Sequence, residues 1–565
     1  MTAESKEEGL TFQIGLSMAG AISAGAYTAG VMDYLTETLT KWEEAKQNGK
    51  EDVPIHEIKI GVMAGASAGG ITSVLTSVAI QNDIPHVDIS KRKDEKYKEE
   101  NLFYNTWVNL TNRDMMKDLL SLDDIEDGEV ISLLNSSFKD RLADKLIKQI
   151  PSVKPHKSFA DDLDVIVTLS NLTGIPYHIG FKSNIWEEYE YHTMLHKDYG
   201  HFIIGPYSYN NDGKIPIDFT IKDNPNFDVL KSCTKATGAF PVGLAPRFIK
   251  RDSKYVNDHP LLNLEIKSKG VPIEKTPYKT LNVDGGLMNN EPFEITKKYI
   301  LNRYPETERE KEEKKITSDT FTHTIILIDP FPGEKIVDET VEKRPRLIKN
   351  IIGSIISTMQ EQLRFKPADI KAAYDEEDYS RFLIAPARDY DEELINVHPP
   401  IQGSKAIACG SLGGFGGFLD VKFREHDFYL GRRNCQRFLQ HYFVVPEDNG
   451  NPIFTKGYSS KAKDKFRITK DDKNYLPIIP DLNYKNKAQE EKATFFPKYN
   501  KSTLDKIKPG LEDRIKKVVL NISDFGFLIK IGLKIALAAF KSAIADSILK
   551  TIKDNLIDPE RPLIR

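Results

Sequence analysis

The stretch from Ile58 to Ile71 reads I-K-I-G-V-M-A-G-A-S-A-G-G-I, an apolar run that passes through G-A-S-A-G and returns to apolar residues. This pattern predicts a strand, a sharp turn and a helix, with Ser67 on the turn. A nucleophilic serine on such a turn needs very small neighbours. Gly65 and Gly69 and two alanines surround it, and Gly70 lets the helix pack closely on the strand. We interpret the stretch as a nucleophile elbow.

The residues after this turn support that interpretation. Ile71, Val74, Leu75 and Val78 give the following helix an apolar stripe, whereas a chance G-x-S-x-G pattern needs neither a strand before it nor a helix after it. The free N–H groups at the start of the helix point toward the serine. The N–H of Ala68 is therefore a candidate donor to an oxyanion.

A second strand-to-turn unit lies closer to the N-terminus. Thr11 to Met18 predicts a strand, residues 19–26 form a small-residue loop, and an apolar helix follows. Such a loop can turn consecutive N–H groups toward one anion, either an oxyanion or a nucleotide phosphate. The chain has no G-x-G-x-x-G at the proper spacing and no G-x-x-x-x-G-K-[ST]. Close packing of the helix on the strand is the structural alternative.

The third element is a short strand that begins near Lys279 and ends in Asp284, Gly285 and Gly286. An acid on a glycine turn is more often structural than catalytic when it stands alone. Its position gains meaning from the two units that precede it.

In this order the three elements resemble the patatin-like phospholipase family, a group of lipid acyl hydrolases that use a Ser-Asp dyad. Gly15 to Val31 is similar to the family's opening G-L-x-L-x-G-G-G-x-[RK]-G-x-x-x-x-G-V, and Lys235 to Pro246 resembles its small-residue segment with two prolines. The resemblance covers about residues 10–330. It implies that Ser67 is the nucleophile and Asp284 the general base.

The resemblance also implies an oxyanion hole in the loop of residues 19–25, at Gly20, Ala21 and Ile22, with help from Ala68. Where the family usually has a run of glycines and then Arg or Lys, this chain has G-A-I-S-A, so Ala24 replaces the basic residue. Alanine and isoleucine disfavour positive φ. We therefore expect this loop to be held differently from the family's usual geometry.

These roles imply covalent acyl transfer, in which Asp284 takes the proton of Ser67 as the hydroxyl attacks an ester carbonyl. Burial must raise the pKa of the carboxyl if it is to act as a base near neutral pH. The implied substrates are phospholipids or other acyl esters, with no cofactor and no metal.

Several alternatives stay open. An acyltransferase or a general carboxylesterase would use the same dyad, and a catalytically weak lipid- or membrane-binding regulatory protein is the alternative of another class. A histidine base is the mechanistic alternative, and four histidines follow the elbow at a distance: His323, His398, His426 and His441.

Composition restricts the class of protein further. The 565 residues include 79 basic and 83 acidic side chains, and a net charge of -4 gives no sign of nucleic-acid binding. Cys233, Cys409 and Cys435 are few and far apart, which argues for free thiols in a reducing compartment. The polar N-terminus shows no secretory signal. We expect a cytoplasmic protein, with peripheral contact at the inner membrane surface as an option.

Strands and helices alternate through the first part of the chain, which predicts an α/β fold: a three-layer α/β/α arrangement with a mostly parallel central sheet, plus a helical C-terminal extension. The expected strands are 11–18, 57–64, 163–172, 280–284 and 322–329. We divide the chain into a catalytic domain (1–335), a helical and strand extension packed on it (336–445), a polar irregular segment with little core (446–510) and an amphipathic helical tail (511–565).

The extension carries three further signals. Residues 346–364 predict an amphipathic helix, and residues 381–386 predict a strand at an edge of the sheet. The glycine-rich stretch 403–417 is either a mobile lid or a surface loop. Arg432 and Arg433, on a predicted helix, either hold a lipid phosphate or pair with acids, and we favour the ion pairs.

The tail changes character from residue 515 to residue 557, where it becomes apolar with lysines at helical spacing. Lys530 and Lys534 interrupt any long apolar span, so we expect no membrane-crossing helix. The tail is either an interfacial helix, with Ile535 and Phe540 toward acyl chains, or a helix docked on the catalytic domain.

Overall fold

The computed structural model describes residues 10–565 except residues 84, 127–128, 182–188, 207–212, 266–270, 304–315, 334–377, 389–399, 493–494, 523–526, 558–560, 562 and 564–565. Within the described residues, nine strands form one mixed sheet in the order β5-β4-β3-β2-β1-β8-β9, with β7 paired to β3 and β6 paired to β7. The strands of this sheet are β1 (Thr11–Met18), β2 (Glu57–Gly65), β3 (Phe159–Phe181), β4 (Tyr189–Ile204), β5 (Ile215–Ile217), β6 (Arg247–Arg251), β7 (Tyr278–Asp284), β8 (His323–Ile328) and β9 (Arg381–Ile384).

The centre of the sheet is parallel, because β9, β8, β1, β2 and the first part of β3 all run in one direction. β4 and β7 are antiparallel to β3. Side chains of successive residues in a strand point to opposite faces. In β8, Ile326 and Ile328 belong to one hydrophobic cluster, whereas Ile325 and Leu327 belong to another. Both faces of the sheet are therefore buried, as expected for a parallel sheet covered by helices.

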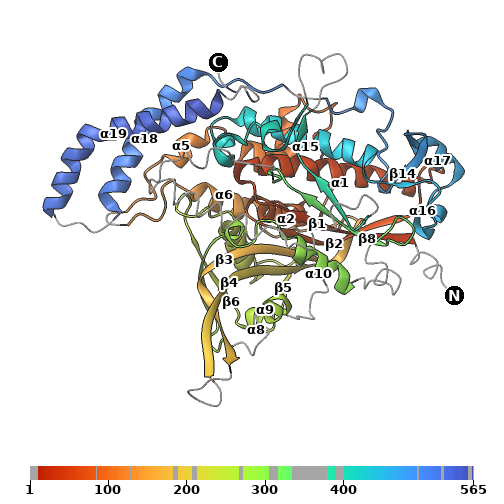
Figure 1. Ribbon diagram of the computed structural model, residues 1–565, viewed down its shortest axis with the longest axis horizontal. Helices are drawn as coiled ribbons and strands as arrows, with labels where there is room; N and C mark the ends of the chain where they lie inside the picture. Colours follow the sequence, from red (N-terminus) through yellow and green to blue (C-terminus); the bar gives the residue numbers. More distant parts are fainter. Residues whose placement is uncertain are drawn as a thin grey trace.

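Helices cover the two faces (Figure 1). On one side lie α1 and α2 with α15 beyond α1, and on the other lie α8, α9 and α10. This arrangement confirms the predicted three-layer α/β fold with a helical C-terminal region. The helices in the first part of the chain are α1 (Gly25–Gln47), α2 (Ala68–Ala79), α3 (Glu95–Glu100), α4 (Leu102–Tyr104), α5 (Met115–Leu119), α6 (Ser137–Leu146), α7 (Phe227–Thr237), α8 (Lys254–Asn257), α9 (Pro260–Glu265) and α10 (Phe293–Arg303). Those in the second part are α15 (Val421–His441), α16 (Pro452–Gly457), α17 (Ser460–Phe466), α18 (Lys501–Asn521) and α19 (Phe527–Leu556).

The extension is built into the catalytic fold through α15, which packs along α1. The two helices approach closely at two glycines. A Cβ atom on Gly30 would lie 1.9 Å from the carbonyl oxygen of Phe428, and one on Gly431 would lie 2.1 Å from that of Tyr27. Glycine is required at both positions because any larger side chain would push the helices apart.

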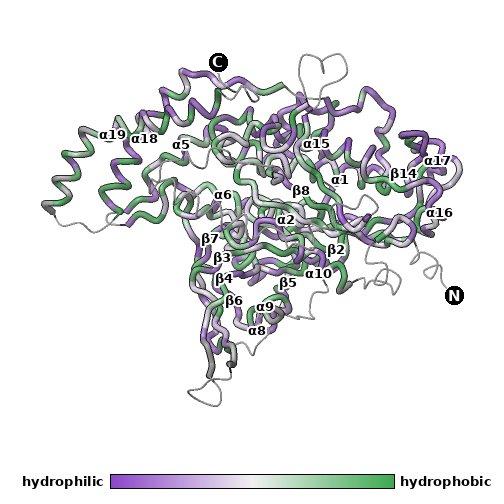
Figure 2. Tube along the Cα trace, in the orientation of Figure 1, coloured by the Kyte–Doolittle hydropathy of each residue, from purple (hydrophilic) through white to green (hydrophobic). Residues whose placement is uncertain are grey.

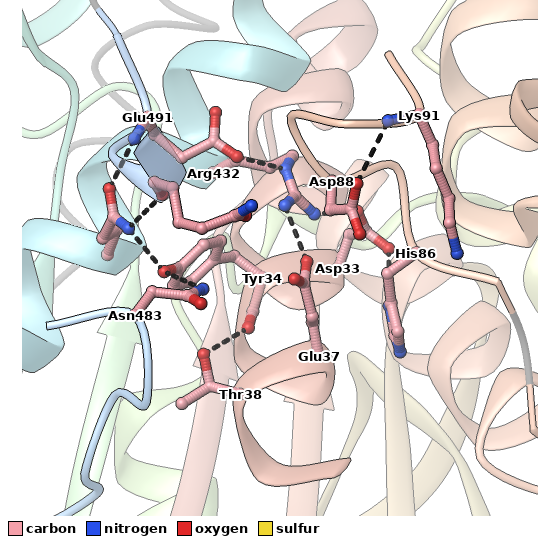
Figure 3. A network of polar contacts seen from close by, with 12 residues as sticks. Asp33, Tyr34, Glu37, Thr38, His86, Asp88, Lys91, Arg432, Asn483 and Glu491 are labelled. Atoms are coloured by element: carbon pink, nitrogen blue, oxygen red, sulfur yellow. Dashed lines mark hydrogen bonds and ion pairs between the residues drawn. The ribbon is translucent and has the colours of Figure 1, made fainter. Parts of the chain in front are cut away.

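A buried network of charges closes the same interface (Figure 3). Arg432 on α15 donates to Asp33, to Glu37 at 2.7 Å and to Glu491 at 3.0 Å. Burial is the largest single effect and raises the pKa values of Asp33 and Glu37, but the guanidinium and the neighbouring His86 together with Asn101 or Lys41 outweigh it and hold both pKa values below their usual range. The expectation that Arg432 pairs with acids is confirmed, although its partners are distant in sequence.

The prediction that residues 446–510 form an irregular segment with little core was wrong. β12 (Val444–Pro446), β14 (Lys473–Pro477) and β13 (Ile468–Lys470) form a separate three-stranded sheet, and α16 and α17 lie between β12 and β13 in the chain. A further two-stranded sheet joins β10 (Ala387–Arg388) and β11 (Ile401–Gln402). Phe454, Phe466 and Leu476 are buried in the main hydrophobic cluster. The polar average of this segment concealed isolated apolar residues that converge on one core.

The other expectations for the extension have different outcomes. The predicted strand at 381–386 is confirmed as β9, which pairs only with β8 among the described strands and so lies at the sheet edge. The predicted helix at 346–364 lies outside the described residues. The glycine-rich stretch forms three short 3-10 turns at Gly403–Ala406, Ser411–Gly414 and Gly416–Phe418.

The tail is helical, as expected, but α18 already begins at Lys501 and α19 follows it as a separate helix. The two lie side by side and extend away from the body of the molecule (Figure 1). Within the described residues, neither these helices nor any other are long and apolar enough to cross a membrane.

Candidate active site

Ser67 stands on a strained turn between β2 and α2. Its backbone has φ +49° and ψ −121°, a conformation that costs free energy for a residue with a side chain. Small neighbours make the turn possible. A Cβ atom on Gly65 would lie 2.3 Å from the carbonyl carbon of Gly69, and one on Gly69 would lie 2.1 Å from the carbonyl oxygen of Met18. The structure therefore has the backbone geometry that the elbow motif predicts.

Asp284 lies against this serine. The hydroxyl Oγ of Ser67 donates to Oδ2 of Asp284 at 2.6 Å, and the other carboxylate oxygen accepts the N–H of Gly286 at 2.8 Å. The turn after the acid must be small, since a Cβ on Gly285 would lie 2.1 Å from the carbonyl oxygen of Thr168. Gly285 and Gly286 thus hold the carboxylate in place.

The sheet topology explains how two residues so distant in sequence meet. Ser67 follows the carboxyl end of β2, and Gly65 pairs with Val167 on β3. Asp284 ends β7, which runs antiparallel to β3, and it pairs with Leu169. β2 and β7 run in opposite directions and both end at the same level of β3, which brings Asp284 to Ser67.

The environment of Asp284 makes its carboxylate a stronger base than that of a surface aspartate. Burial raises its pKa to about 6, although the hydrogen bonds from Ser67 and Gly286 and the charge of Lys139 all oppose the rise. At neutral pH the carboxyl is therefore ionised, yet it holds a proton much more readily than a surface aspartate.

Thr237, which the sequence analysis did not single out, supports the elbow from behind. Its hydroxyl oxygen accepts the backbone N–H of Ser67 at 2.9 Å, and it also lies close to Gly70. The only signal for it in the sequence was its place in the small-residue segment after Lys235. Ser170 has a similar supporting role, since its hydroxyl donates to the carbonyl oxygen of Asp284 at 2.7 Å.

The loop after β1 lies beside the serine. The N–H of Gly20 donates to the carbonyl oxygen of Asn290 at 3.1 Å, so Gly20 is engaged and does not point a free donor at the site. Ile22 has φ +49°, a strained value for a β-branched residue, and its side chain lines the site. Among the described residues, the N–H groups of Ala21, Ile22 and Ala68 make no hydrogen bond.

Two hollows meet at Ser67. The first is apolar and runs under α6 and the end of α7, where Trp107, Phe138 and Leu142 are among its walls. The second lies beside Asp284 and Asn290 and is bounded by Ser404 and Gly413 of the glycine-rich stretch. In this arrangement an apolar chain could bind on one side of the Ser67 hydroxyl and a polar group on the other.

Two lysines line the apolar hollow, Lys139 and Lys235, and Lys235 is paired with Asp140 at 3.0 Å. The ammonium group of Lys139 donates to the carbonyl oxygens of Gly238 at 3.2 Å and Lys235 at 3.4 Å, at the C-terminal end of α7. No carboxylate of the described structure lies within ion-pair distance of it. Burial, and next the charge of Arg247, lower the pKa of Lys139 to about 7.

The histidines do not approach the serine in the part of the chain that the structure describes. His426 contacts Asp427 on α15 at 2.7 Å, and His323 lies on β8. His398 falls outside the described residues. Of the described side chains, Asp284 alone hydrogen-bonds the hydroxyl of Ser67.

The fold and this site define a class of three-layer α/β proteins that carry a serine elbow against a buried acid. Residues 16–297 match the family model described as patatin-like phospholipase. A relative from Sinorhizobium fredii (strain NBRC 101917 / NGR234), described as "Uncharacterized protein y4iI", is 31% identical over 516 residues, covering 83% of this chain and 70% of its own length. The chain belongs to the patatin-like phospholipase family, a family of lipid acyl hydrolases. Because the aligned length exceeds the family match, the relative shares part of the extension as well.

Proposed function

We propose that the protein is a lipid acyl hydrolase of the phospholipase A type that cleaves acyl esters through a Ser67 acyl-enzyme. The observation that carries the proposal is the 2.6 Å hydrogen bond from Ser67 to a buried Asp284 at the point where an apolar hollow meets a more polar one. A hydroxyl bonded to a buried carboxylate, beside a place for an acyl chain, is what acyl transfer to serine requires.

In the first half of the reaction, Asp284 accepts the proton of Ser67 as Oγ attacks the ester carbonyl carbon. The free N–H groups of Ala21, Ile22 and Ala68 stabilise the negative charge that develops on the carbonyl oxygen. Asp284 then gives its proton to the departing alcohol oxygen, and the acyl group remains on the serine.

In the second half, Asp284 takes a proton from a water molecule that attacks the acyl-enzyme, and returns it to Oγ as the fatty acid leaves. The apolar walls under α6 suit the acyl chain. The hollow beside Asn290 suits the glycerol and headgroup of a phospholipid.

The test compares fatty acid release from mixed phospholipid vesicles and from a soluble short-chain ester, with EDTA present. The variants are Ser67→Ala, Asp284→Asn and the matched control Ser73→Ala, whose hydroxyl bonds only Gly69 and Met18 on the buried side of α2. We expect loss of at least a thousandfold in kcat for the first two and little change for the third.

Labelling with a fluorophosphonate probe separates the alternatives. Probe uptake that depends on Ser67, together with ester products when an alcohol replaces water, would favour an acyltransferase or esterase on the same dyad. Absence of uptake and of hydrolysis in the wild type would favour the lipid-binding regulatory protein. Full activity of Asp284→Asn would refute the role of this acid as the base.

A further inference from the structure

The α18–α19 hairpin exposes several large apolar side chains, which is unusual for the surface of a soluble protein. Ile535 is 68% exposed and Phe540 63%, and further isoleucines follow along α19 at 529, 531, 544 and 548. Figure 2 shows hydrophobic turns along this helix. One strip of α19 is covered by α18, where Lys508 pairs with Asp546 and Lys541 with Glu512. The C-terminal part of α19 also packs on the body, since Leu549 and Leu556 belong to the main hydrophobic cluster. An extended apolar surface of this kind indicates a binding partner.

A buried arginine connects the hairpin to the rim of the active site, in addition to the apolar residues that pack on the body. Arg514 of α18 is buried, and it donates to the carbonyl oxygens of Leu133 at 2.9 Å and Ser132 at 3.1 Å and to the carboxylate of Asp124 at 2.9 Å. Buried bidentate arginine contacts of this kind hold a fixed geometry. The segment around residues 121–134 therefore contributes to the orientation of the hairpin.

That segment itself reaches the mouth of the site. The N–H of Leu133 donates to the carbonyl oxygen of Val242 at 2.9 Å, and the neighbouring residues Phe240 and Leu244 line the two hollows at Ser67. The side chains of this rim are apolar and exposed. Val242 is 70% exposed and Ile131 59%. Exposed apolar residues thus occur on both sides of the Arg514 connection, on the rim and on the hairpin.

The net charge of the hairpin indicates which kind of partner its apolar surface binds. Residues 501–556 contain eleven basic and six acidic side chains, a net charge of +5 in a chain whose net charge is -4. A second copy of the hairpin would meet this charge with its own and be repelled. An anionic phospholipid surface offers both acyl chains for the apolar residues and headgroups for the lysines.

We propose that α19 and the rim residues Ile131, Leu133 and Val242 form one docking surface for an anionic phospholipid bilayer, which places the mouth of the active site on the lipid. The benefit of this docking rests on the proposed function, but the exposed apolar residues and the charge that support it do not. It also selects the interfacial alternative for the tail over a helix that serves only to pack on the body.

The test measures co-sedimentation of the full-length protein with vesicles of phosphatidylcholine containing 30% phosphatidylglycerol, with pure phosphatidylcholine vesicles for comparison. The hairpin variant is Ile535→Asp with Phe540→Asp, and the rim variant is Ile131→Asp. The matched control is Ile55→Asp, because Ile55 is 61% exposed but lies beside Gly457, next to α16.

We expect the wild type and the control to bind the anionic vesicles, with binding at least tenfold weaker on pure phosphatidylcholine or in 0.5 M salt. Both docking variants should lose at least tenfold in vesicle affinity and in hydrolysis of vesicle lipid. The hairpin variant should keep its activity on the soluble ester, which shows that it folds.

Three results would overturn the docking surface: no binding by the wild type, undiminished binding by both variants, or a stable dimer in sedimentation velocity that the hairpin variant dissolves. The docking surface and the proposed function fail separately. A wild type that binds vesicles but hydrolyses neither substrate would refute the function alone, whereas one that hydrolyses the soluble ester but binds no vesicles would refute the docking alone.

Discussion

Asp284→Asn should make the protein more stable at neutral pH while it abolishes hydrolysis. Asparagine keeps the shape of the side chain, and its oxygen can still accept the N–H of Gly286. It removes a charge that burial disfavours. The acid is held for chemistry at a cost to the folded state, and the variant removes that cost.

The magnitude follows from the pKa of this carboxyl, which burial raises from 3.8 to about 6. A difference of about two pKa units corresponds to about 3 kcal/mol. Because the folded state holds the proton more tightly than the unfolded state, the wild type loses this stability as the pH rises from about 4 to above 6. The variant has no such loss. Its advantage should be near zero at pH 4 and at most about 3 kcal/mol at pH 7 and above.

The assay is thermal unfolding of wild type and variant in parallel, from pH 4 to pH 8. For a chain of this length the entropy of unfolding is about 1.2 kcal/mol/K, so the difference in Tm should grow from zero to about 2 to 3 °C. A variant that is less stable than the wild type at pH 8, or a Tm difference that does not change with pH, would refute the inference that burial destabilises the charged acid.

The remaining predictions concern the support of the site and of the fold. Lys139 is charged at pH 6, and its charge lowers the pKa of Asp284. Lys139→Met should therefore move the acidic limb of the kcat/KM profile on a soluble ester to higher pH, and Lys139→Arg should move it less. An acidic limb that does not move in Lys139→Met would contradict this. Thr237→Val should leave the N–H of Ser67 unpaired. It should lower the free energy of unfolding in urea by about 1 to 3 kcal/mol and lower kcat about tenfold. Thr237→Ser should retain most of the stability and most of the activity. Arg432→Met should remove the partner that three buried carboxylates share and leave them with Lys41, His86 and Arg92 on their other sides. It should lower the free energy of unfolding by about 3 kcal/mol. A loss below about 1 kcal/mol would show that the network is dispensable.

Sequence reasoning located those elements that carry their own local signal. β1, β2, β7 and β8 lie within two residues of the expected bounds. The parallel strands β1, β2 and β8 are buried and largely apolar, and the antiparallel β7 is marked by the Asp-Gly-Gly turn at its end. The expected strand at 163–172 covered only the buried part of β3. Its remainder, to Phe181, is held by pairing with β4 and has no such run, so it could not be recognised before its partner was known.

The candidate site shows the same division. Ser67 and Asp284 stand in motifs that need particular neighbours, so both positions could be predicted, and the family resemblance implied that they act together; the structure gives the hydrogen bond between them. Thr237 and Lys139 act through single long-range contacts that leave no pattern around them. The donor role expected of Gly20 was lost to a hydrogen bond with Asn290, a pairing that no local rule describes.

The close packing of α1 on α15 determines when during synthesis the fold can be completed. Gly30 leaves the ribosome about four hundred residues ahead of Gly431, an interval of about 20 to 80 s at ordinary rates of synthesis. Through that interval one side of α1 has no partner and the buried acids Asp33 and Glu37 lack Arg432. The fold around α1 is therefore incomplete until α15, which ends at His441, has been made.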